Sequence, residues 1–430
     1  MSYSHDRFEN RTPRHQRKKE LTVLIFISLI IISTIFVYTY FLFFPIITSK
    51  YPKINIRYEN ELSATGYNNC TFELNSNDES EKIFLLDGKI KIRGSGDKQG
   101  VNRWPKKGYR IELSEEESLL GMRKDDDWLL LAMYLDYPRM RIKMCFDVWG
   151  RLEPTNPTAI APESEYVTLF LNGEFEGLYL LVEKNDRRLY GLEDVQNNIN
   201  SSFIFQVKGH TILDTYLPAA WEQDWPNEDE GIYIMEEILT PLFSFINDSS
   251  DAEFFNCKNG IFSKFDKLNL IDFFVFNYFI YHEDFWIKNY FIIRNSYPNK
   301  LFLVPWDYDH SFGGFRGNEY EADDNNELYI REHNRLYDRL IGNNDFIKNC
   351  SDRWFQLRND LWTDEFFSDT LTENYEEIDD ILEIETDMWN PVVFNENWHN
   401  DSDKSVEKLY QWITDRLKFC DIYFDSKYSL

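Results

Sequence analysis

The sequence predicts an α+β protein with a β-rich N-terminal lobe, a mainly helical C-terminal lobe and a single transmembrane helix ahead of both. Three observations support this prediction. Residues 21–47 contain no charged side chain. Short segments of alternating polarity, separated by turn residues, fill residues 81–210 or thereabouts, and apolar segments at helical spacing dominate from about 211 to 430. A chain of 430 residues is long enough for one large catalytic unit.

The N-terminal apolar run predicts a transmembrane signal anchor. It is long enough to cross the roughly 30 Å hydrocarbon core of a bilayer as a helix. Residues 1–20 carry six Lys or Arg against three acidic residues, so the positive-inside rule places this basic tail in the cytosol. The alternatives are a cleaved signal peptide, for which the run is too long, and a buried core helix. The expected localisation is therefore a single-pass membrane protein, anchored by residues 21–47, with its catalytic domain luminal or extracellular.

A stalk is expected over residues 48–80, followed by one domain over 81–430. Five Asn-x-Ser/Thr sequons and five cysteines lie beyond the apolar run, so a luminal domain would be a candidate glycoprotein. The net charge of −28 argues against a nucleic-acid partner, because a phosphate backbone repels an acidic surface. It does not exclude a nucleotide enzyme, in which Mg²⁺ and a few local cations neutralise phosphates. The sequons begin at Asn69, Asn200, Asn247, Asn349 and Asn400.

The β-rich lobe is predicted from alternation and from turn residues. Strands are expected at 89–93, 107–113, 128–133, 166–171, 177–182 and 203–207, with a helix at 140–152. Asn172-Gly173 between two apolar runs is a strong hairpin signal. In the helical lobe, 268–281 is largely apolar and predicts a buried helix. Two strands are expected at 289–294 and 301–306, and helices from 335 onward.

The sharpest chemical pattern is His282-x-Asp284-x-x-x-x-Asn289, the spacing of a protein-kinase catalytic loop. Phosphoryl transfer needs a carboxylate that orients the attacking hydroxyl and accepts its proton. It also needs an oxygen ligand for a metal ion nearby, and one short loop can supply both groups. The competing interpretation is a polar turn at the C-terminus of a helix.

A second pattern follows the predicted strand 301–306. Asp307 and Asp309 come directly after an apolar run, where a loop can present carboxylates to Mg²⁺. A solvated Asp-rich turn or a structural Ca²⁺ loop would look similar, although a Ca²⁺ loop usually supplies more carboxylates.

A third pattern joins the Gly-rich segment 93–96 to the paired lysines Lys106 and Lys107. Such turns let backbone N–H groups approach phosphate oxygens, and a nearby Lys supplies positive charge. Strand alternation predicts that Lys107, with Ile111, faces inward and that Lys106 faces the other way. Two solvated lysines beside a turn are the alternative.

Taken together and in this order, the segments resemble the CotH family of spore-coat atypical protein kinases, over about residues 89–313. The resemblance implies a two-lobed atypical protein-kinase-like fold that binds ATP and Mg²⁺ and phosphorylates Ser or Thr of a secreted or surface protein. The segments that carry it are 93–95, 106–111, 140–143, 172–173, 177–183, Asp284, 289–290 and 305–309.

The resemblance also assigns residue roles. It implies Asp284 as the catalytic base, and Asp307 with Asn289 as metal ligands. We expect Asp309 as a further metal ligand from its place in the same turn. For the nucleotide, it implies Lys107 with Arg93, Lys106 as the paired lysine, and Glu183 as a partner of that Lys or as part of the pocket. The helix 140–150 departs from the family pattern by containing no Glu to pair with a Lys.

Two other functions remain open from the sequence. A catalytically weak CotH-like surface binding protein or adhesin would use the same fold as a platform. A metal-dependent hydrolase would usually show more His ligands than a chain with seven His provides. The kinase interpretation requires that the turn holding Asp284 and the turn holding Asp307 face each other across one pocket.

Overall fold

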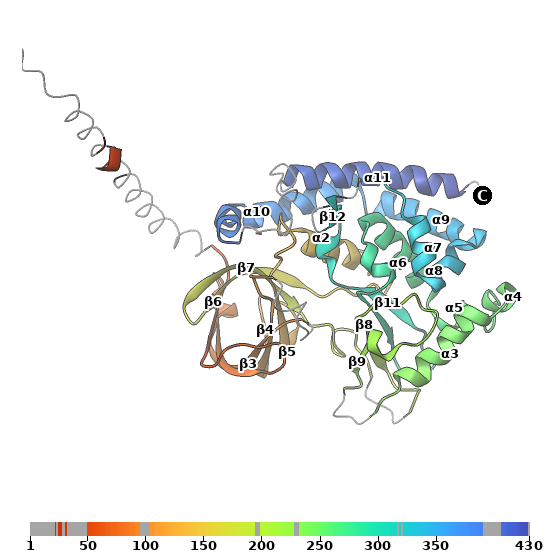
Figure 1. Ribbon diagram of the computed structural model, residues 1–430, viewed down its shortest axis with the longest axis horizontal. Coiled ribbons are helices and arrows are strands. Elements are labelled where there is room, and N and C mark those ends of the chain that lie inside the picture. Colours follow the sequence, from red (N-terminus) through yellow and green to blue (C-terminus); the bar gives the residue numbers. More distant parts are fainter. Residues whose placement is uncertain are drawn as a thin grey trace, which may run out of the picture.

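The computed structural model describes most of the chain beyond the apolar run. The described residues are 50–94, 104–193, 198–227, 232–315, 318–319, 321–389 and 406–428, with Thr22, 25–27 and Ile31. Figure 1 shows a β-barrel beside a larger part built from helices and a second sheet. A long helical layer formed by α10 (Asp364–Met388) and α11 (Val406–Tyr428) lies along one side of both parts.

Seven strands close the barrel, in the order β1-β2-β3-β4-β5-β7-β6. Neighbours pair antiparallel except β1 and β6, which pair in parallel and complete the closure. The strands are β1 (Lys53–Tyr58), β2 (Asn68–Asn75), β3 (Ile83–Ile92), β4 (Tyr109–Ser118), β5 (Lys124–Leu131), β6 (Ser164–Leu171) and β7 (Glu174–Glu183). The crossover from β5 to β6 contains α2 (Arg141–Gly150).

Alternate residues of each strand fill the barrel interior. Ile54, Phe72, Ile90, Ile111 and Trp128 are all fully buried there. Their neighbours along the strands point outward. On β3 and β4 these include Lys91 and Arg110, whereas Leu129 and Leu131 of β5 pack into the second hydrophobic cluster. Closure leaves no edge strand with unpaired backbone groups, which explains why alternating segments of modest length suffice.

The second part is organised around α6 (Lys267–Ile280), which is mostly apolar. Residues 269–280 of this helix are all buried, as expected for a helix surrounded by other elements. A four-stranded antiparallel sheet in the order β11-β10-β8-β9 packs beside it. Its strands are β8 (Phe203–Val207), β9 (Trp221–Trp225), β10 (Tyr290–Arg294) and β11 (Phe302–Pro305).

The remaining helices surround α6 and the sheet (Figure 1). They are α3 (Met235–Asp248), α4 (Asp251–Phe254), α5 (Ile261–Lys264), α7 (Glu327–His333), α8 (Arg335–Ile341) and α9 (Asn344–Asp360). A two-stranded ribbon, β12 (Gly314–Phe315) with β13 (Asn318–Glu319), follows the sheet. The buried helix, both strands of the later hairpin and the Asn172-Gly173 turn agree with the sequence predictions, and both turn residues have positive φ.

The predicted two-lobed atypical protein-kinase-like fold is wrong. Its β-rich lobe is a closed seven-stranded barrel, because β1 and β2 continue the sheet and β1 pairs with β6. These two strands lie within residues 48–80, which the sequence predicted to be a stalk. β1 and β2 pair with their sequence neighbours, and only the closing pairing of β1 with β6 joins distant segments, which local alternation does not reveal.

A transmembrane helix formed part of the same predicted fold and has no counterpart in the described part of the structure. Within the described ranges, no helix combines the length and the apolar character needed to cross a bilayer. The predicted anchor, residues 21–47, lies outside the described residues apart from Thr22, 25–27 and Ile31, and the basic tail 1–20 lies wholly outside them.

Candidate functional site

Two turns, far apart in sequence, are joined by hydrogen bonds. The α6 turn (281–289) follows α6 and contains the short 3-10 helix η4 (Glu283–Trp286); the β11 turn (306–313) follows β11 and contains η5 (Tyr308–His310). The Phe312 backbone N–H donates to the Ile280 carbonyl oxygen at 2.7 Å. The His282 ring donates through Nε2 to the Asp307 carbonyl oxygen at 3.0 Å. The two turns predicted to carry the chemistry are therefore neighbours.

His282 acts as a brace between these turns. Its ring is fully buried and stacks on Phe285, with ring centroids 3.8 Å apart. Burial, and then the nearby His310, lowers the pKa of His282 to about 3. The ring is thus neutral at physiological pH, with its proton on Nε2 because only a donor can bond to a carbonyl oxygen.

Unusual backbone conformations concentrate in the same turns. Tyr281, Asn289, Asp307 and Phe312 all have positive φ, between 49° and 70°. Such a conformation is unfavourable for residues other than Gly, although Asn and Asp tolerate it better. Two further hydrogen bonds fix Asn289: its N–H donates to the Val207 carbonyl oxygen, and its own carbonyl oxygen accepts from the Trp306 N–H at 2.9 Å. Asn289 therefore lies beside the residue that precedes Asp307.

Asp284 forms an ion pair within the α6 turn. Lys288 Nζ lies 2.9 Å from Asp284 Oδ2, at i,i+4 spacing, and both side chains are about one-fifth exposed. Burial raises the pKa of Asp284, but His282, the Lys288 charge and the Lys288 hydrogen bond together outweigh it and lower that pKa below its ordinary value. Asp284 is therefore an ionised carboxylate at neutral pH, held next to a cation.

The pKa of Asp309 is shifted in the opposite direction to that of Asp284. Its side chain is 28% exposed. Burial, followed by the charges of Asp307, Asp284 and Asp136, raises the pKa of Asp309 well above its ordinary value, and Arg93 only partly offsets them. Like charges within a few ångströms disfavour joint ionisation. The carboxylates of the two turns therefore face a common region, which a bound cation would stabilise.

Helix α2 supports the β11 turn from behind. The Phe146 ring meets Tyr308 edge-on at 5.2 Å, and Cys145 Sγ donates to Ser311 Oγ at 3.2 Å. Asp136, fully buried ahead of this helix, accepts a hydrogen bond from the Ile142 N–H and lies 3.7 Å from the Arg141 guanidinium. The β11 turn is thus held on a rigid base.

The donor set fits a hard divalent cation that is completed by other ligands. No group of three His, Cys, Asp or Glu side chains in the described part of the chain is close enough to hold a metal ion alone. Mg²⁺ usually takes only one or two carboxylates from protein, with water and substrate phosphates filling its shell. Asp307 and Asp309, with their unfavourable mutual repulsion, are suited to that arrangement.

Arg93 connects the barrel to this region. It follows β3, and its guanidinium lies 5.6 Å from the centre of the Trp306 ring. It is also the cation that lowers the pKa of Asp309. The predicted glycine-rich turn lies outside the described residues from Ser95 onward.

The paired lysines are placed opposite to expectation. Lys106 is the buried one, and its ammonium bonds to Glu385 of α10 and to the Leu178 carbonyl oxygen. Burial lowers the pKa of Lys106 to about 8, opposed by Glu385. Lys107 is half-buried and donates to the Trp104 carbonyl oxygen. Because β4 begins only at Tyr109, strand alternation does not extend to the lysines.

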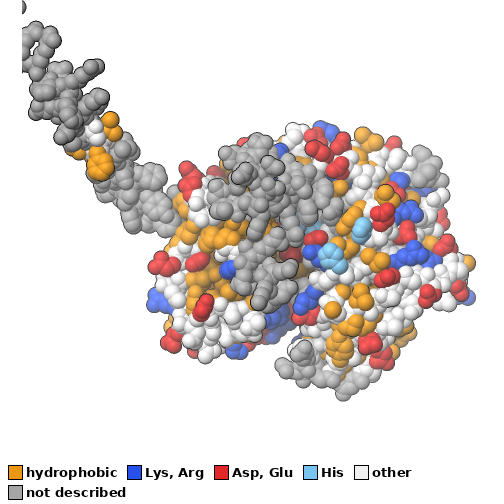
Figure 2. All heavy atoms as spheres, viewed as in Figure 1, with side chains coloured by type: hydrophobic (Ala, Val, Ile, Leu, Met, Phe, Trp, Pro, Cys, Tyr) orange, Lys and Arg blue, Asp and Glu red, His pale blue; other side chains and the backbone are white. Residues whose placement is uncertain are grey.

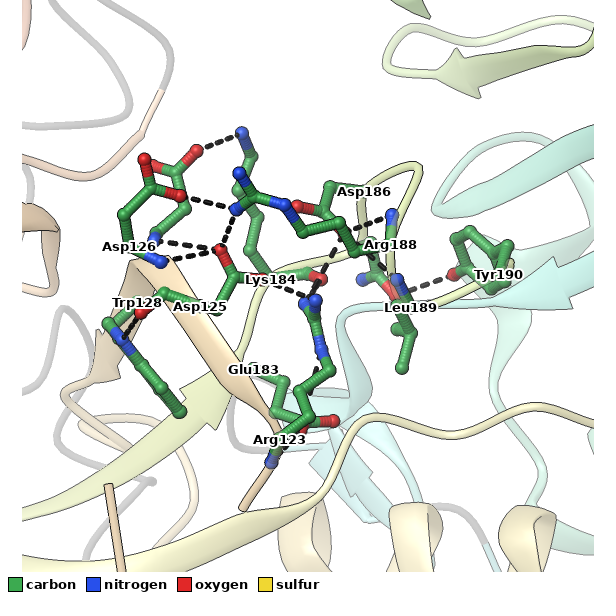
Figure 3. Close-up of polar contacts among 12 residues, drawn as sticks. Arg123, Asp125, Asp126, Trp128, Glu183, Lys184, Asp186, Arg188, Leu189 and Tyr190 are labelled. Carbon is green, nitrogen blue, oxygen red and sulfur yellow. Dashed lines mark hydrogen bonds and ion pairs between the residues drawn. The ribbon is translucent and has the colours of Figure 1, made fainter. Parts of the chain in front are cut away.

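Glu183 is bound by backbone groups rather than by a Lys. Its Oε1 accepts from the Arg123 N–H and its Oε2 from the Glu163 N–H, both at 3.0 Å. Figure 3 shows Arg123 reaching from the start of β5 toward Glu183 and Asp186, at 3.4 and 3.3 Å. Burial raises the pKa of Glu183.

Three residues of these clusters were missed in the sequence. Lys288 stands inside the catalytic-loop pattern, and its i,i+4 spacing from Asp284 was a usable signal. Asp136 stands a short distance before a predicted helix, where an Asp often caps the helix N-terminus. Glu385 gave no signal, because it meets Lys106 only through the packing of α10 on the barrel.

Comparison with known proteins gives two matches. The family model described as CotH kinase protein matches residues 90–420. Inner spore coat protein H of Bacillus subtilis (strain 168) is 25% identical over 306 residues, which cover 68% of this chain and 77% of that protein. The matched region contains both turns, the barrel from the end of β3 onward, and most of α11.

The relative also bears on the expected localisation. Its name describes a spore coat protein, whereas the sequence predicted a single-pass membrane protein with a luminal or extracellular catalytic domain. Together with the lack of a membrane-spanning helix among the described residues, this corrects the predicted localisation.

Proposed function

The chain belongs to the CotH kinase protein family, and from this premise we propose that it is a Mg²⁺-dependent protein kinase that transfers the γ-phosphate of ATP to Ser or Thr. One observation carries the proposal. The turn that holds Asp284 and the turn that holds Asp307 and Asp309 are joined by two hydrogen bonds, from the Phe312 N–H to the Ile280 carbonyl oxygen and from His282 Nε2 to the Asp307 carbonyl oxygen. A carboxylate base beside oxygen ligands for a metal is the minimum that phosphoryl transfer requires.

Asp284 is the proposed catalytic residue. Its ionised carboxylate would accept a hydrogen bond from the substrate hydroxyl and orient its oxygen toward the γ-phosphorus. As the new P–O bond forms, the bond to the β,γ-bridging oxygen breaks, ADP leaves, and the hydroxyl proton passes to Asp284. Lys288, 2.9 Å from Asp284 Oδ2, is a proposed positioning residue that holds the carboxylate in place.

The other predicted site residues divide into two groups. Asp307, Asp309 and Asn289 would hold Mg²⁺, which when bound supplies positive charge to the phosphates. Arg93 is half-buried and reaches the region from the barrel end. It is proposed, together with Lys107, to contact phosphate oxygens. Lys106 and Glu183 are engaged elsewhere, with Glu385 and with backbone N–H groups, so we assign both a structural role.

Radiolabelled phosphate transfer to a generic protein substrate tests this function. We expect the wild-type chain to label the substrate or itself, and Asp284→Ala to reduce labelling about 10³-fold. Asp284→Ala should still bind Mg²⁺-ATP, detected as a rise in melting temperature, because a ligand of the folded state stabilises it.

Asp307→Ala provides the matched comparison. It should lose the Mg²⁺-ATP response as well as transfer, since Asp307 is a proposed metal ligand. A wild-type chain that shows neither transfer nor a nucleotide-dependent shift would contradict the kinase proposal and favour a binding protein.

A further inference from the structure

Two cations face each other across the outer surface of the barrel. In the antiparallel ladder of β3 and β4, Lys91 lies directly opposite Arg110. Both side chains reach one aromatic ring, with Lys91 Nζ 4.5 Å and the Arg110 guanidinium 5.8 Å from the centre of Tyr67. Like charges directly opposite in a ladder destabilise it. This pair therefore costs stability in the free protein.

The next pair on the same face has the arrangement that a ladder normally favours. Two residues along each strand, Lys89 lies opposite Glu112, and their side chains form an ion pair at 2.7 Å. Lys91, in contrast, has no carboxylate within ion-pair distance among the residues that the structure describes. The two pairs share strands and face, although Lys89 is exposed and Lys91 is half-buried, and only Lys91 lies opposite a cation.

Lys184, just after β7, adds a third cation. Arg110 bonds to both oxygens of Asp127 at 3.0–3.1 Å, and Lys184 Nζ bonds to Asp127 Oδ2 at 2.8 Å. One carboxylate is thus shared by two cations. Figure 3 shows Lys184 extending from the end of β7 toward this carboxylate-rich edge of β5. Burial, and then the charges of Arg110 and Lys184, lower the pKa of Lys91.

Asp224 of β9 balances only part of this charge. It lies near Lys184 and Arg110, and burial nevertheless raises its pKa to about 6. Lys91, Arg110 and Lys184 therefore face Asp127 and Asp224, in a chain whose net charge is −28. Glu112 is also near but is already paired with Lys89, and Asp224 faces Lys208 as well. Figure 2 likewise shows Lys and Arg side chains gathered where the barrel meets the rest of the molecule.

A hydrogen-bond donor is also available beside these cations. The Tyr67 hydroxyl is buried and makes no hydrogen bond within the described part of the chain. Its ring already contacts Lys91 and Arg110. An acceptor between the cations would satisfy this hydroxyl and relieve their repulsion at once.

We propose that Lys91, Arg110 and Lys184, here called the basic triad, bind a phosphate group, with Tyr67 as a platform. Arg93 follows Lys91 by two residues and reaches Trp306, so the triad adjoins the proposed catalytic region. Binding at the triad does not require that the chain transfer phosphate. The phosphate belongs either to a nucleotide or to a phosphorylated side chain of a peptide substrate.

Lys91→Glu in the full chain gives the sharpest test. Glu at this position would face Arg110 as Glu112 faces Lys89, so the ligand-free protein should melt about 1 °C higher. The same change should weaken the binding of inorganic phosphate at least about tenfold, measured from the phosphate-dependent rise in melting temperature at constant ionic strength. If Lys91 had only a structural role, the substitution would not raise the melting temperature and weaken phosphate binding together.

Lys89→Glu is the matched control. It places two carboxylates opposite each other, so the ligand-free protein should melt lower while its phosphate response stays at the wild-type level. Lys184→Met is a second variant of the triad, and it should weaken phosphate binding without the gain in melting temperature.

Two further probes distinguish the sources of the phosphate. If Lys91→Glu binds ATP more weakly than wild type, the phosphate at the triad is that of a nucleotide. If it binds ATP normally and only a phosphoserine peptide more weakly, the phosphate is that of a peptide substrate. Lack of response of the wild-type protein to all three probes overturns the triad, as does a wild-type response in Lys91→Glu. The two proposals can also fail separately. If the wild-type chain transfers phosphate but Lys91→Glu binds all three probes as well as wild type, phosphate binding at the basic triad is contradicted and the kinase proposal is not.

Discussion

Two clusters of partly or fully buried charge in this molecule differ in their balance. Where α10 packs on the barrel, the Glu385 carboxylate bonds to Lys106, to Arg139 and to the Leu178 N–H. All of its partners belong to the chain. In the α6 and β11 turns, Asp284, Asp307 and Asp309 lie together, and the charges of the first two raise the pKa of the third.

This difference in charge balance distinguishes a cluster that stabilises the fold from a cluster that can bind a ligand. A buried carboxylate with matched cations is complete, and the fold is built to enclose it: Gly177 lies against Glu385 so closely that a Cβ there would collide with the carboxylate. Carboxylates that repel each other are incomplete, and a ligand of opposite charge would stabilise them. The basic triad also has unbalanced charge, but there the excess is positive and an anion would stabilise it.

The largest expected effect is on the complete cluster. Glu385→Gln should lower the free energy of unfolding by about 3–5 kcal/mol, because it leaves Lys106 and Arg139 buried without a counter-charge. Urea denaturation measures the change. Glu383→Gln, at an exposed position on the same helix, should stay within about 0.5 kcal/mol of wild type. If Glu385→Gln changed the free energy of unfolding as little as Glu383→Gln, the Glu385 cluster would not be the stabilising one, and the contrast with the two turns would fail.

A smaller effect is expected at Lys288. Lys288→Met should reduce phosphate transfer about tenfold, the cost of one charge-assisted hydrogen bond. It should also move the acid limb of the pH–rate profile to higher pH. Although burial opposes it, Lys288 helps to lower the pKa of Asp284, so Asp284 would bind its proton more tightly without it. Lys288→Arg should restore both values; an unmoved acid limb would argue against this role.

The smallest effect is expected at Asp309, and its sign is opposite to that at Glu385. The pKa of Asp309 is raised in the folded state, so its ionisation costs stability that grows as pH rises above about 4. Asp309→Asn should therefore stabilise the ligand-free protein at pH 7, by on the order of 1 kcal/mol, and the gain should vanish toward pH 4. Urea denaturation at both pH values measures it. The variant should also lose stabilisation by Mg²⁺-ATP; destabilisation at pH 7 would contradict the incomplete site.

Local patterns in the sequence predicted the elements that carry this chemistry. The apolar run 268–281 became α6, and the strands before Asp307 and after Asn289 became β11 and β10. Alternation, the Asn172-Gly173 turn and the catalytic-loop spacing are properties of neighbouring residues, which is why they can be read without a structure.

Tertiary structure alone decided how these elements close and which charges meet. Residues 53–75 joined the barrel, Lys106 turned inward to Glu385 at the far end of the chain, and Lys91 was set opposite Arg110. Barrel closure and the Lys106–Glu385 pair join distant segments, and the Lys91–Arg110 pair is set by the register of neighbouring strands. None of them follows from the residues on either side. The sequence determined which groups are present, and only the fold determined whether each charge found a partner.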